Sequence, residues 1–233
     1  MVTKEEYIKR VLLIMNEAGL MDVDKNSLLG ADTAQVDRYI EGSFVDAWRA
    51  CARVMPRVWF RNLSFASSQL VSDISNGTGY VVLPDDFYLL TGFKMQGWKK
   101  GVYEAFINNE KTASIQSNEY TRGSTIRPVC TISNKLIGST VRQVLNYYSL
   151  NRGVSHIVEE ALYIPAETSL KDRSDDYQLN LSDQILEPIA YLSASTVFVM
   201  FEKYDIAKAL EQRAIEMFPG LKSVRGTNIT IKQ

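Results

Sequence analysis

The spacing of apolar residues changes along this chain of 233 residues, and that change restricts the folds it can form. Apolar residues recur every three or four positions from Tyr7 to Ala18 and from Val36 to Met55, as on the buried face of a helix. Between Tyr80 and Ile164, short apolar runs separated by turn residues predict strands. Helical spacing returns from Ile185 to Met217. Helices and strands segregated in this way predict an α+β fold.

The order of these segments predicts how the chain is divided. We expect a helical bundle formed by the N- and C-terminal segments, residues 1–75 and 183–218, with a β-rich domain of residues 76–182 inserted between them. Pro219 and Gly220 should end the last helix, so residues 219–233 are predicted to form an extended C-terminal arm. Its candidate assembly residues are Leu221, Ile229 and Ile231.

Local signals predict where some elements begin and end. Thr3 followed by Glu6 is typical of a capping box, in which the two side chains satisfy free amides of the first helical turn. Pro56 should kink or end the second helix. Residues 129–137 are interpreted as a hairpin with its turn at Ser133 and Asn134.

The residue types that carry most enzyme chemistry are scarce in this chain. His156 is the one histidine, and the distant Cys51 and Cys130 give no familiar zinc-site spacing with it. A Ser-His-Asp mechanism would have to pass through His156, and the acidic doublet at Asp85 and Asp86 is explained by a turn after Pro84. The sequence therefore predicts no enzyme activity, no metal and no cofactor. A hydrolase built on two carboxylates distant in sequence stays open.

No segment is expected to enter a membrane. The most apolar stretch, Ile189–Phe201, has 13 residues, which is too short to cross a bilayer and predicts a buried helix. The first 19 residues are charged and amphipathic, without the apolar centre of a signal peptide. We expect a soluble protein made in the cytoplasm.

Formal charge is distributed unevenly along the chain. Residues 1–46 carry 5 basic and 9 acidic side chains, residues 47–158 carry 13 and 6, and residues 159–233 carry 8 and 12. The net charges are −4, +7 and −4, so a nearly neutral sequence has a basic middle between two acidic ends.

Two sets of basic residues in this middle are candidates for a DNA-channel wall or for subunit interfaces. The first recurs every fourth residue and would form one stripe if the helix continued: Arg49, Arg53, Arg57 and Arg61. The second lies in a stretch with no acidic residue from Tyr120 to Val158: Arg122, Arg127, Lys135, Arg142 and Arg152. Nucleic acid phosphates or acidic groups of another subunit would neutralise them. The alternative is a solvated face, or pairing with the acidic helices of the same chain.

The order of features resembles the head-to-tail connector proteins of short-tailed bacteriophages, a group of adaptor, tail-tubular and ring proteins that includes the ring proteins of crAss-like phages. The matching features lie between about residues 30 and 218: a Trp-bearing helix at 46–61, strands at 83–90 and 93–98, the hairpin at 127–137, a strand ending in Tyr147 and Tyr148, and closing helices at 183–218.

This resemblance implies a structural protein of the virion, located at the head–tail junction. Such proteins form homo-oligomeric rings, typically of 12 copies, that join the portal protein to other tail or ring proteins and enclose double-stranded DNA without reading its sequence. A ring has heterologous interfaces, and a terminal arm could order on the neighbouring copy. The rival hypothesis is a non-catalytic nucleic-acid-binding or regulatory module that uses the basic middle and binds DNA as a monomer.

Overall fold

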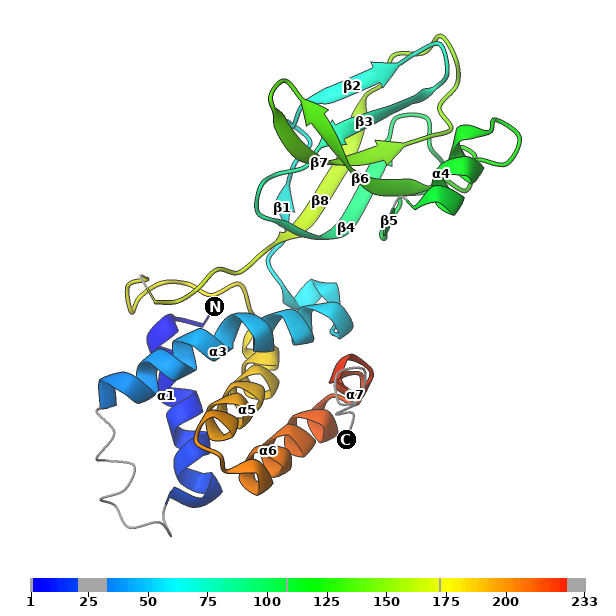
Figure 1. The fold of residues 1–233 in the computed structure, drawn as a ribbon. Coiled ribbons are helices and arrows are strands. Elements are labelled where there is room, and N and C mark those ends of the chain that lie inside the picture. The colour runs from blue at the N-terminus through cyan, green and yellow to red at the C-terminus, as the bar shows by residue number, and fades with distance from the viewer. Residues whose placement is uncertain (1, 21–32, 108, 172, 226–233) are drawn as a thin grey trace. The chain divides into compact units, whose positions relative to one another are not determined.

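A computed structural model describes residues 2–20, 33–107, 109–171 and 173–225 (Figure 1). The chain forms two compact units. The helical unit comprises Met1–Arg61 and Glu167–Gln233, and the β unit comprises Asn62–Ala166. The chain passes from one unit to the other at 61/62 and again at 166/167. These points lie 14 and 16 residues before the predicted domain boundaries at 75/76 and 182/183.

The helical unit is organised around one central helix. Its elements are α1 (Lys4–Met15), η1 (Asn16–Leu20), α3 (Thr33–Val54), η2 (Arg57–Trp59), α5 (Asp183–Met200), α6 (Tyr204–Met217) and α7 (Leu221–Arg225). Helix α5 packs against α1, α3 and α6 (Figure 1). Tyr7 of α1 meets Phe44 of α3 edge to face, with ring centroids 5.0 Å apart, and Trp48 meets Phe60 in the same way at 5.8 Å. The Tyr7 and Phe44 rings join α1 to α3, and the Tyr7 hydroxyl donates a hydrogen bond to the hydroxyl of Ser193 in α5.

The predicted helix signals at the N-terminal end are confirmed. Thr3 is the N-cap of α1: its hydroxyl accepts a bond from the amide of Glu6, and the Glu6 carboxylate accepts one from the amide of Thr3. Helix α3 ends at Val54, two residues before Pro56, because proline at the next turn removes a donor and clashes with the preceding turn.

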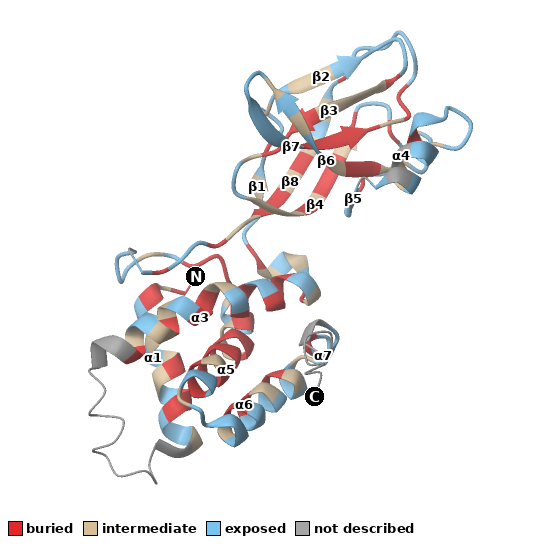
Figure 2. Ribbon diagram, viewed as in Figure 1, coloured by how far each residue is buried: buried red, intermediate tan, exposed pale blue. Residues whose placement is uncertain are grey.

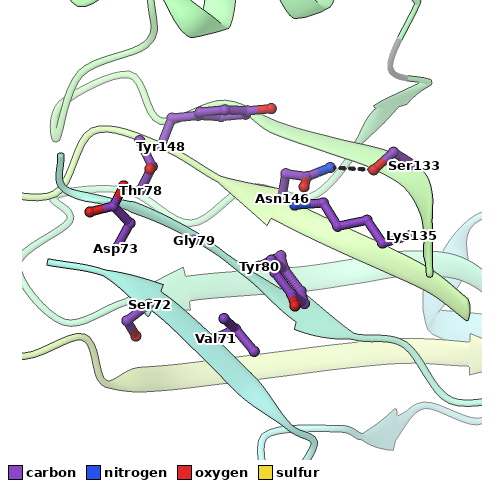
Figure 3. Close-up of a pocket in the computed structure, with 10 residues that line it drawn as sticks. All are labelled: Val71, Ser72, Asp73, Thr78, Gly79, Tyr80, Ser133, Lys135, Asn146 and Tyr148. Carbon is purple, nitrogen blue, oxygen red and sulfur yellow. Dashed lines mark hydrogen bonds between the residues drawn. The ribbon is translucent and has the colours of Figure 1, made fainter. Parts of the chain in front are cut away.

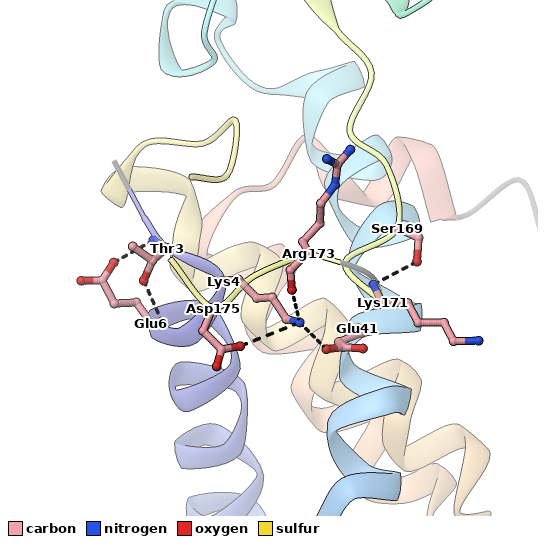
Figure 4. A network of polar contacts seen from close by, with 8 residues as sticks. All are labelled: Thr3, Lys4, Glu6, Glu41, Ser169, Lys171, Arg173 and Asp175. Carbon is pink, nitrogen blue, oxygen red and sulfur yellow. Dashed lines mark hydrogen bonds and ion pairs between the residues drawn. The ribbon is translucent and has the colours of Figure 1, made fainter. Parts of the chain in front are cut away.

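A buried lysine ties α1 to two other parts of the helical unit (Figure 4). The ammonium of Lys4 lies 2.7 Å from a carboxylate oxygen of Glu41 in α3 and donates to the carbonyl of Arg173 at 2.9 Å. Asp175 approaches the same ammonium at 3.9 Å. One buried oxygen of Asp37 has no hydrogen-bond partner, and burial, followed by the charge of Glu41, raises the pKa of Asp37. Lys4 is therefore the cation of an otherwise acidic cluster.

The β unit contains two sheets and one short helix. Its elements are β1 (Leu63–Ser64), β2 (Leu70–Asp73), β3 (Thr78–Val82), β4 (Phe87–Met95), β5 (Phe106–Ile107), α4 (Glu110–Ser117), β6 (Cys130–Ile137), β7 (Thr140–Tyr147) and β8 (Val158–Pro165). The strand orders are β1-β8-β4 and β2-β3-β7-β6-β5. All pairs are antiparallel except β5 with β6.

The core of the β unit is aromatic and is formed by both sheets. Phe65 stacks on Phe93 with centroids 6.1 Å apart, and Tyr163 meets Phe65 edge to face at 5.8 Å. Trp98 and Tyr147 also contact Phe93. Buried residues gather along β4, β7 and β8 (Figure 2). The β unit therefore has a hydrophobic core of its own.

The predicted hairpin turn at Ser133 and Asn134 is wrong. Strand β6 runs through both residues, which face Val144 and Gln143 of β7. The chain reverses instead at Gly138, whose φ of 63° lies in the left-handed region that glycine adopts readily. The eight residue pairs of the β6–β7 ladder outweigh a local preference for a turn.

The predicted fold class is wrong at the C-terminus, where an extended arm was expected. Residues Leu221–Arg225 form helix α7, and Leu221 is fully buried. Helix α7 packs against α3 and α6, so its first turn belongs to the helical unit. The described chain has six α-helices, and its β-rich middle consists of two sheets with α4. Ile229 and Ile231 lie outside the described residues.

The unit boundaries differ from the predicted domains because contacts near both boundaries assign residues to the other unit. Strand pairing does so at the first boundary and hydrogen bonds do so at the second. Strands β1 and β2, which precede residue 76, pair with β8 and β3 and so belong to the β unit. Residues 167–182 belong to the helical unit, where the buried Glu167 carboxylate accepts a 2.5 Å bond from the amide of Asn180. The carbonyl of Asn180 in turn accepts a 3.0 Å bond from the indole of Trp48.

Candidate binding surfaces

The first set of basic residues does not form one helical stripe. Arg49 and Arg53 are exposed on the last turns of α3, but α3 ends at Val54. Arg57 lies in η2 and Arg61 lies beyond it. The four residues belong to the helical unit, whereas the second basic set belongs to the β unit. The two sets are therefore carried by different units.

Two members of the second set are paired with acids of the β unit. Arg142 lies 3.9 Å from Asp85, and Arg152 forms an ion pair with Glu119. Arg127 is exposed and Arg122 is half-buried. The predicted turn at the acidic doublet is present, and Asp86 accepts a 2.9 Å bond from the hydroxyl of Tyr163. Arg142 and Arg152 therefore pair with acids of the β unit itself, and not with the acidic helices that the alternative named.

The charge contrast seen along the sequence does not coincide with the two units. The β unit carries nine basic and eight acidic residues, a net charge of +1, and the rest of the chain has a net charge of −2. Four basic residues of the segment 47–158 lie in the helical unit. Glu159 and Glu160, which follow that segment, add two negative charges to the β unit. Because the positive and negative charges of the β unit nearly cancel, this unit attracts a polyanion only weakly at long range.

A groove of about 410 Å³ lies on the outer face of the five-stranded sheet (Figure 3). We call it the sheet groove. Strands β2, β3, β6 and β7 and the residue after β7 supply its lining: Val71, Ser72, Asp73, Thr78, Gly79, Tyr80, Ser133, Lys135, Asn146 and Tyr148. Its volume falls within the usual range for sites that bind small ligands or single side chains.

Hydrogen bonds between β6 and β7 hold one wall of the sheet groove in place. The side-chain amide of buried Asn146 donates to the hydroxyl of Ser133 at 2.8 Å and to the carbonyl of Thr131 at 3.1 Å. The hydroxyls of Thr131 and Tyr148 are 2.9 Å apart. This wall is a pre-organised polar surface, since its side chains are fixed by one another.

Lys135 is the cation of the sheet groove. Its ammonium lies 4.0 Å from the centroid of the Tyr80 ring, a cation–π contact. Partial burial lowers the pKa of Lys135. Within the part of the chain that the structure describes, no carboxylate lies within ion-pair distance of this ammonium. Lys135 is also the one residue of the predicted basic sets that lines the groove.

Asp73 lines the sheet groove, and its carboxylate accepts hydrogen bonds from residues of the turn that follows β2. One oxygen accepts bonds from the Ser75 hydroxyl at 2.6 Å and the Asn76 amide at 3.2 Å. The other oxygen accepts a 2.7 Å bond from the Asn76 side chain. These bonds lower the pKa of Asp73. Asp73 therefore stays ionised at the rim of the groove.

The single histidine is buried beneath the same sheet. His156 Nδ1 lies 2.7 Å from the hydroxyl of Tyr147, while the buried Nε2 has no partner among the described residues. Burial lowers the pKa of His156 below its ordinary value of 6.5, and nearby Asp73 opposes that shift. His156 lies in the loop before β8, and no sequence signal indicated its contact with Tyr147.

Acidification is expected to weaken the β unit through His156. Because the folded pKa is depressed, the unfolded chain binds the proton first, and stability present above pH 6.5 is lost as the pH falls. Replacing His156 by Asn should cost about 1 kcal/mol at pH 7 and flatten this loss of stability as the pH falls below 6.5. Urea unfolding at several pH values measures it. An unchanged pH slope in the variant would contradict the prediction.

The other prominent surface is an exposed sheet edge. Phe106 and Ile107 form β5, and their side chains are 59% and 80% exposed. Strand β5 pairs with β6 on one side and is the last strand of its sheet. We call these two residues the β5 edge. No strand was predicted at these two residues, because two residues are too short to show a strand period.

No protein-family model matches this sequence, and no curated protein matches it either. Of the other sequence-predicted residues, Leu221 is buried in α7. Tyr80 and Asn146, which line the groove, were missed; their outward positions on β3 and β7 follow only from the register. Among the described residues, no group of three or more His, Cys, Asp or Glu side chains could hold a metal ion. None of the described helices is both long and apolar enough to cross a membrane.

Proposed function

We propose that this chain is a structural subunit of a head-to-tail connector ring of a short-tailed bacteriophage. In this role, copies of the chain join the portal protein to the tail and surround the DNA channel. The observation that carries the proposal is the β5 edge. Exposed apolar residues on a sheet edge invite pairing with another chain, and monomeric proteins usually protect such edges.

The order of the elements also supports this function. A Trp48-bearing helix precedes two groups of strands, and two long helices follow them, as in the family that the sequence resembles. A closed ring needs two different faces on each subunit, and an unpaired edge can serve as one of them. We propose that the ring, which the resemblance suggests has 12 copies, is part of the virion.

The decisive measurement is the mass of the purified chain by sedimentation over a wide concentration range, with negative-stain images of the same sample. Rings with a central hole are expected, either from the chain alone or after the cognate portal protein is added. A monomer that ignores the portal and binds duplex DNA with a steep salt dependence would instead support the nucleic-acid-binding module. The near-balanced charge of the β unit favours the connector.

Charged substitutions at the β5 edge are expected to weaken assembly. Changing both Phe106→Asp and Ile107→Asp should lower the association constant at least about tenfold, or about 1.4 kcal/mol, because two carboxylates would have to be buried at the contact. Sedimentation measures the change. The matched control is Leu136→Asp on β6, which is 70% exposed. Normal assembly of the double variant, or an equal loss in the control, would remove the β5 edge as the interface.

A further inference from the structure

The sheet groove contains a half-buried cation that has no counter-ion among the described residues. Lys135 contacts the ring of Tyr80, and no described carboxylate lies within ion-pair distance of its ammonium. Asp73 lines the same groove but uses both oxygens in its own turn. Partly burying an ammonium without an anion is unfavourable, so an anionic group placed beside Lys135 would gain a strong interaction.

We propose that the sheet groove binds an acidic side chain, Asp or Glu, carried by a segment of a partner protein. The carboxylate would lie against Lys135, and the rings of Tyr80 and Tyr148 would contact the rest of the segment (Figure 3). This inference does not rest on the proposed function, since it holds equally for a monomeric chain.

The groove presents side chains from the face of the sheet to a bound segment. The lining residues lie on the face of the sheet, where β3, β6 and β7 each have neighbouring strands on both sides. Recognition in the groove would use these side chains, because they project from the face of the sheet, whereas strand addition would take place at its edge. The wall formed by Ser133, Asn146 and Tyr148 is held by its own hydrogen bonds and needs little ordering on binding.

The charges around the groove favour a single carboxylate over a nucleic acid strand. Binding a polyanion takes several unpaired cations along its path. Lys135 is the single cation that lines the groove, and Arg142, its neighbour across the β6–β7 ladder, already lies near Asp85. One ammonium between aromatic and hydroxyl groups is matched better by one carboxylate.

The test uses the full chain and an array of synthetic peptides. Each peptide has about 12 residues, so that in an extended conformation it is at least as long as the groove. Each peptide containing Asp or Glu is paired with the same sequence carrying Asn or Gln. Acidic members should be enriched among the binders. Fluorescence anisotropy of the tightest peptide should then show at least tenfold weaker binding to Lys135→Gln and near-normal binding to Lys135→Arg.

The matched control is Lys99→Gln, which removes one exposed charge elsewhere in the β unit and should leave binding unchanged. A second variant, Tyr80→Leu, should also weaken binding if the groove is the site. The proposal is overturned if no peptide binds, if the Asn and Gln versions bind equally, or if Lys99→Gln has the same effect as Lys135→Gln. Binding of oligo(dT) that depends on Lys135 and displaces the peptide would reassign the groove to nucleic acid.

Discussion

Replacing Trp48 by alanine is expected to destabilise the helical unit by about 3–5 kcal/mol, the usual loss for a large aromatic residue removed from a core. Trp48 is fully buried in α3, and its ring meets Phe60 edge to face. Its indole also donates to the carbonyl of Asn180 at 3.0 Å. The variant therefore loses packing and leaves a buried carbonyl without that donor.

Trp48→Phe separates these two contributions. It keeps an aromatic ring against Phe60 but cannot donate to Asn180, so about 1–3 kcal/mol of loss is expected. Hydrogen exchange followed by mass spectrometry measures the opening free energy of α3 and α5 in each variant. Strands β4 and β8 provide the internal control, because their core in the β unit contains no residue of the helical unit. Equal exchange of α3 in wild type and Trp48→Ala would contradict the prediction.

The elements predicted best are those whose signal is local. The Thr3 capping box depends on residues three positions apart, and Pro56 acts through its own ring, so both were readable from the sequence. Strand β4, Phe87–Met95, also lies in the region from Tyr80 to Ile164 where short apolar runs predicted strands. In each case the physical cause lies within a few residues of its effect.

The elements predicted wrongly depend on residues distant in sequence. Ser133 and Asn134 have turn propensity, but cross-strand bonds to β7 keep them in β6. Residues after Gly220 read as an arm, but burial of Leu221 against the helical unit stabilises α7. Five helical residues are not stable alone, so only tertiary packing explains this helix.

The sheet groove shows the same limit for a binding site. Its lining spans Val71 to Tyr148, and the alignment of β3, β6 and β7 decides which side chains share one face. Charge counted along the sequence selected Lys135 only as one member of a basic run. Lys135 differs from Arg142 and Arg152 in having no carboxylate within ion-pair distance among the described residues, and only the fold shows this difference.

Replacing Lys4 by methionine should be the other strongly destabilising change, at about 3–5 kcal/mol, because it removes one partner of a buried ion pair. The side chains of Lys4 and Glu41 are 7% and 13% exposed, and their charged atoms lie 2.7 Å apart. Without the ammonium, the Glu41 carboxylate is left beside Asp37, whose pKa is already raised by burial. The carbonyl of Arg173 also loses its donor.

A second substitution distinguishes this electrostatic cause from simple loss of packing. In the double variant Lys4→Met with Glu41→Leu, no uncompensated Glu41 charge remains, and apolar replacements of buried ion pairs are often close to neutral. Urea unfolding of the helical unit should therefore show a smaller loss for the double variant than for Lys4→Met alone. The surface pair of Lys9 and Glu5 provides the matched control, since Lys9→Met breaks an exposed i,i+4 pair and should cost less than about 0.5 kcal/mol. If the two Lys4 variants lose the same stability, Glu41 is not the cause, and the methylene stem of Lys4 contributes through packing instead.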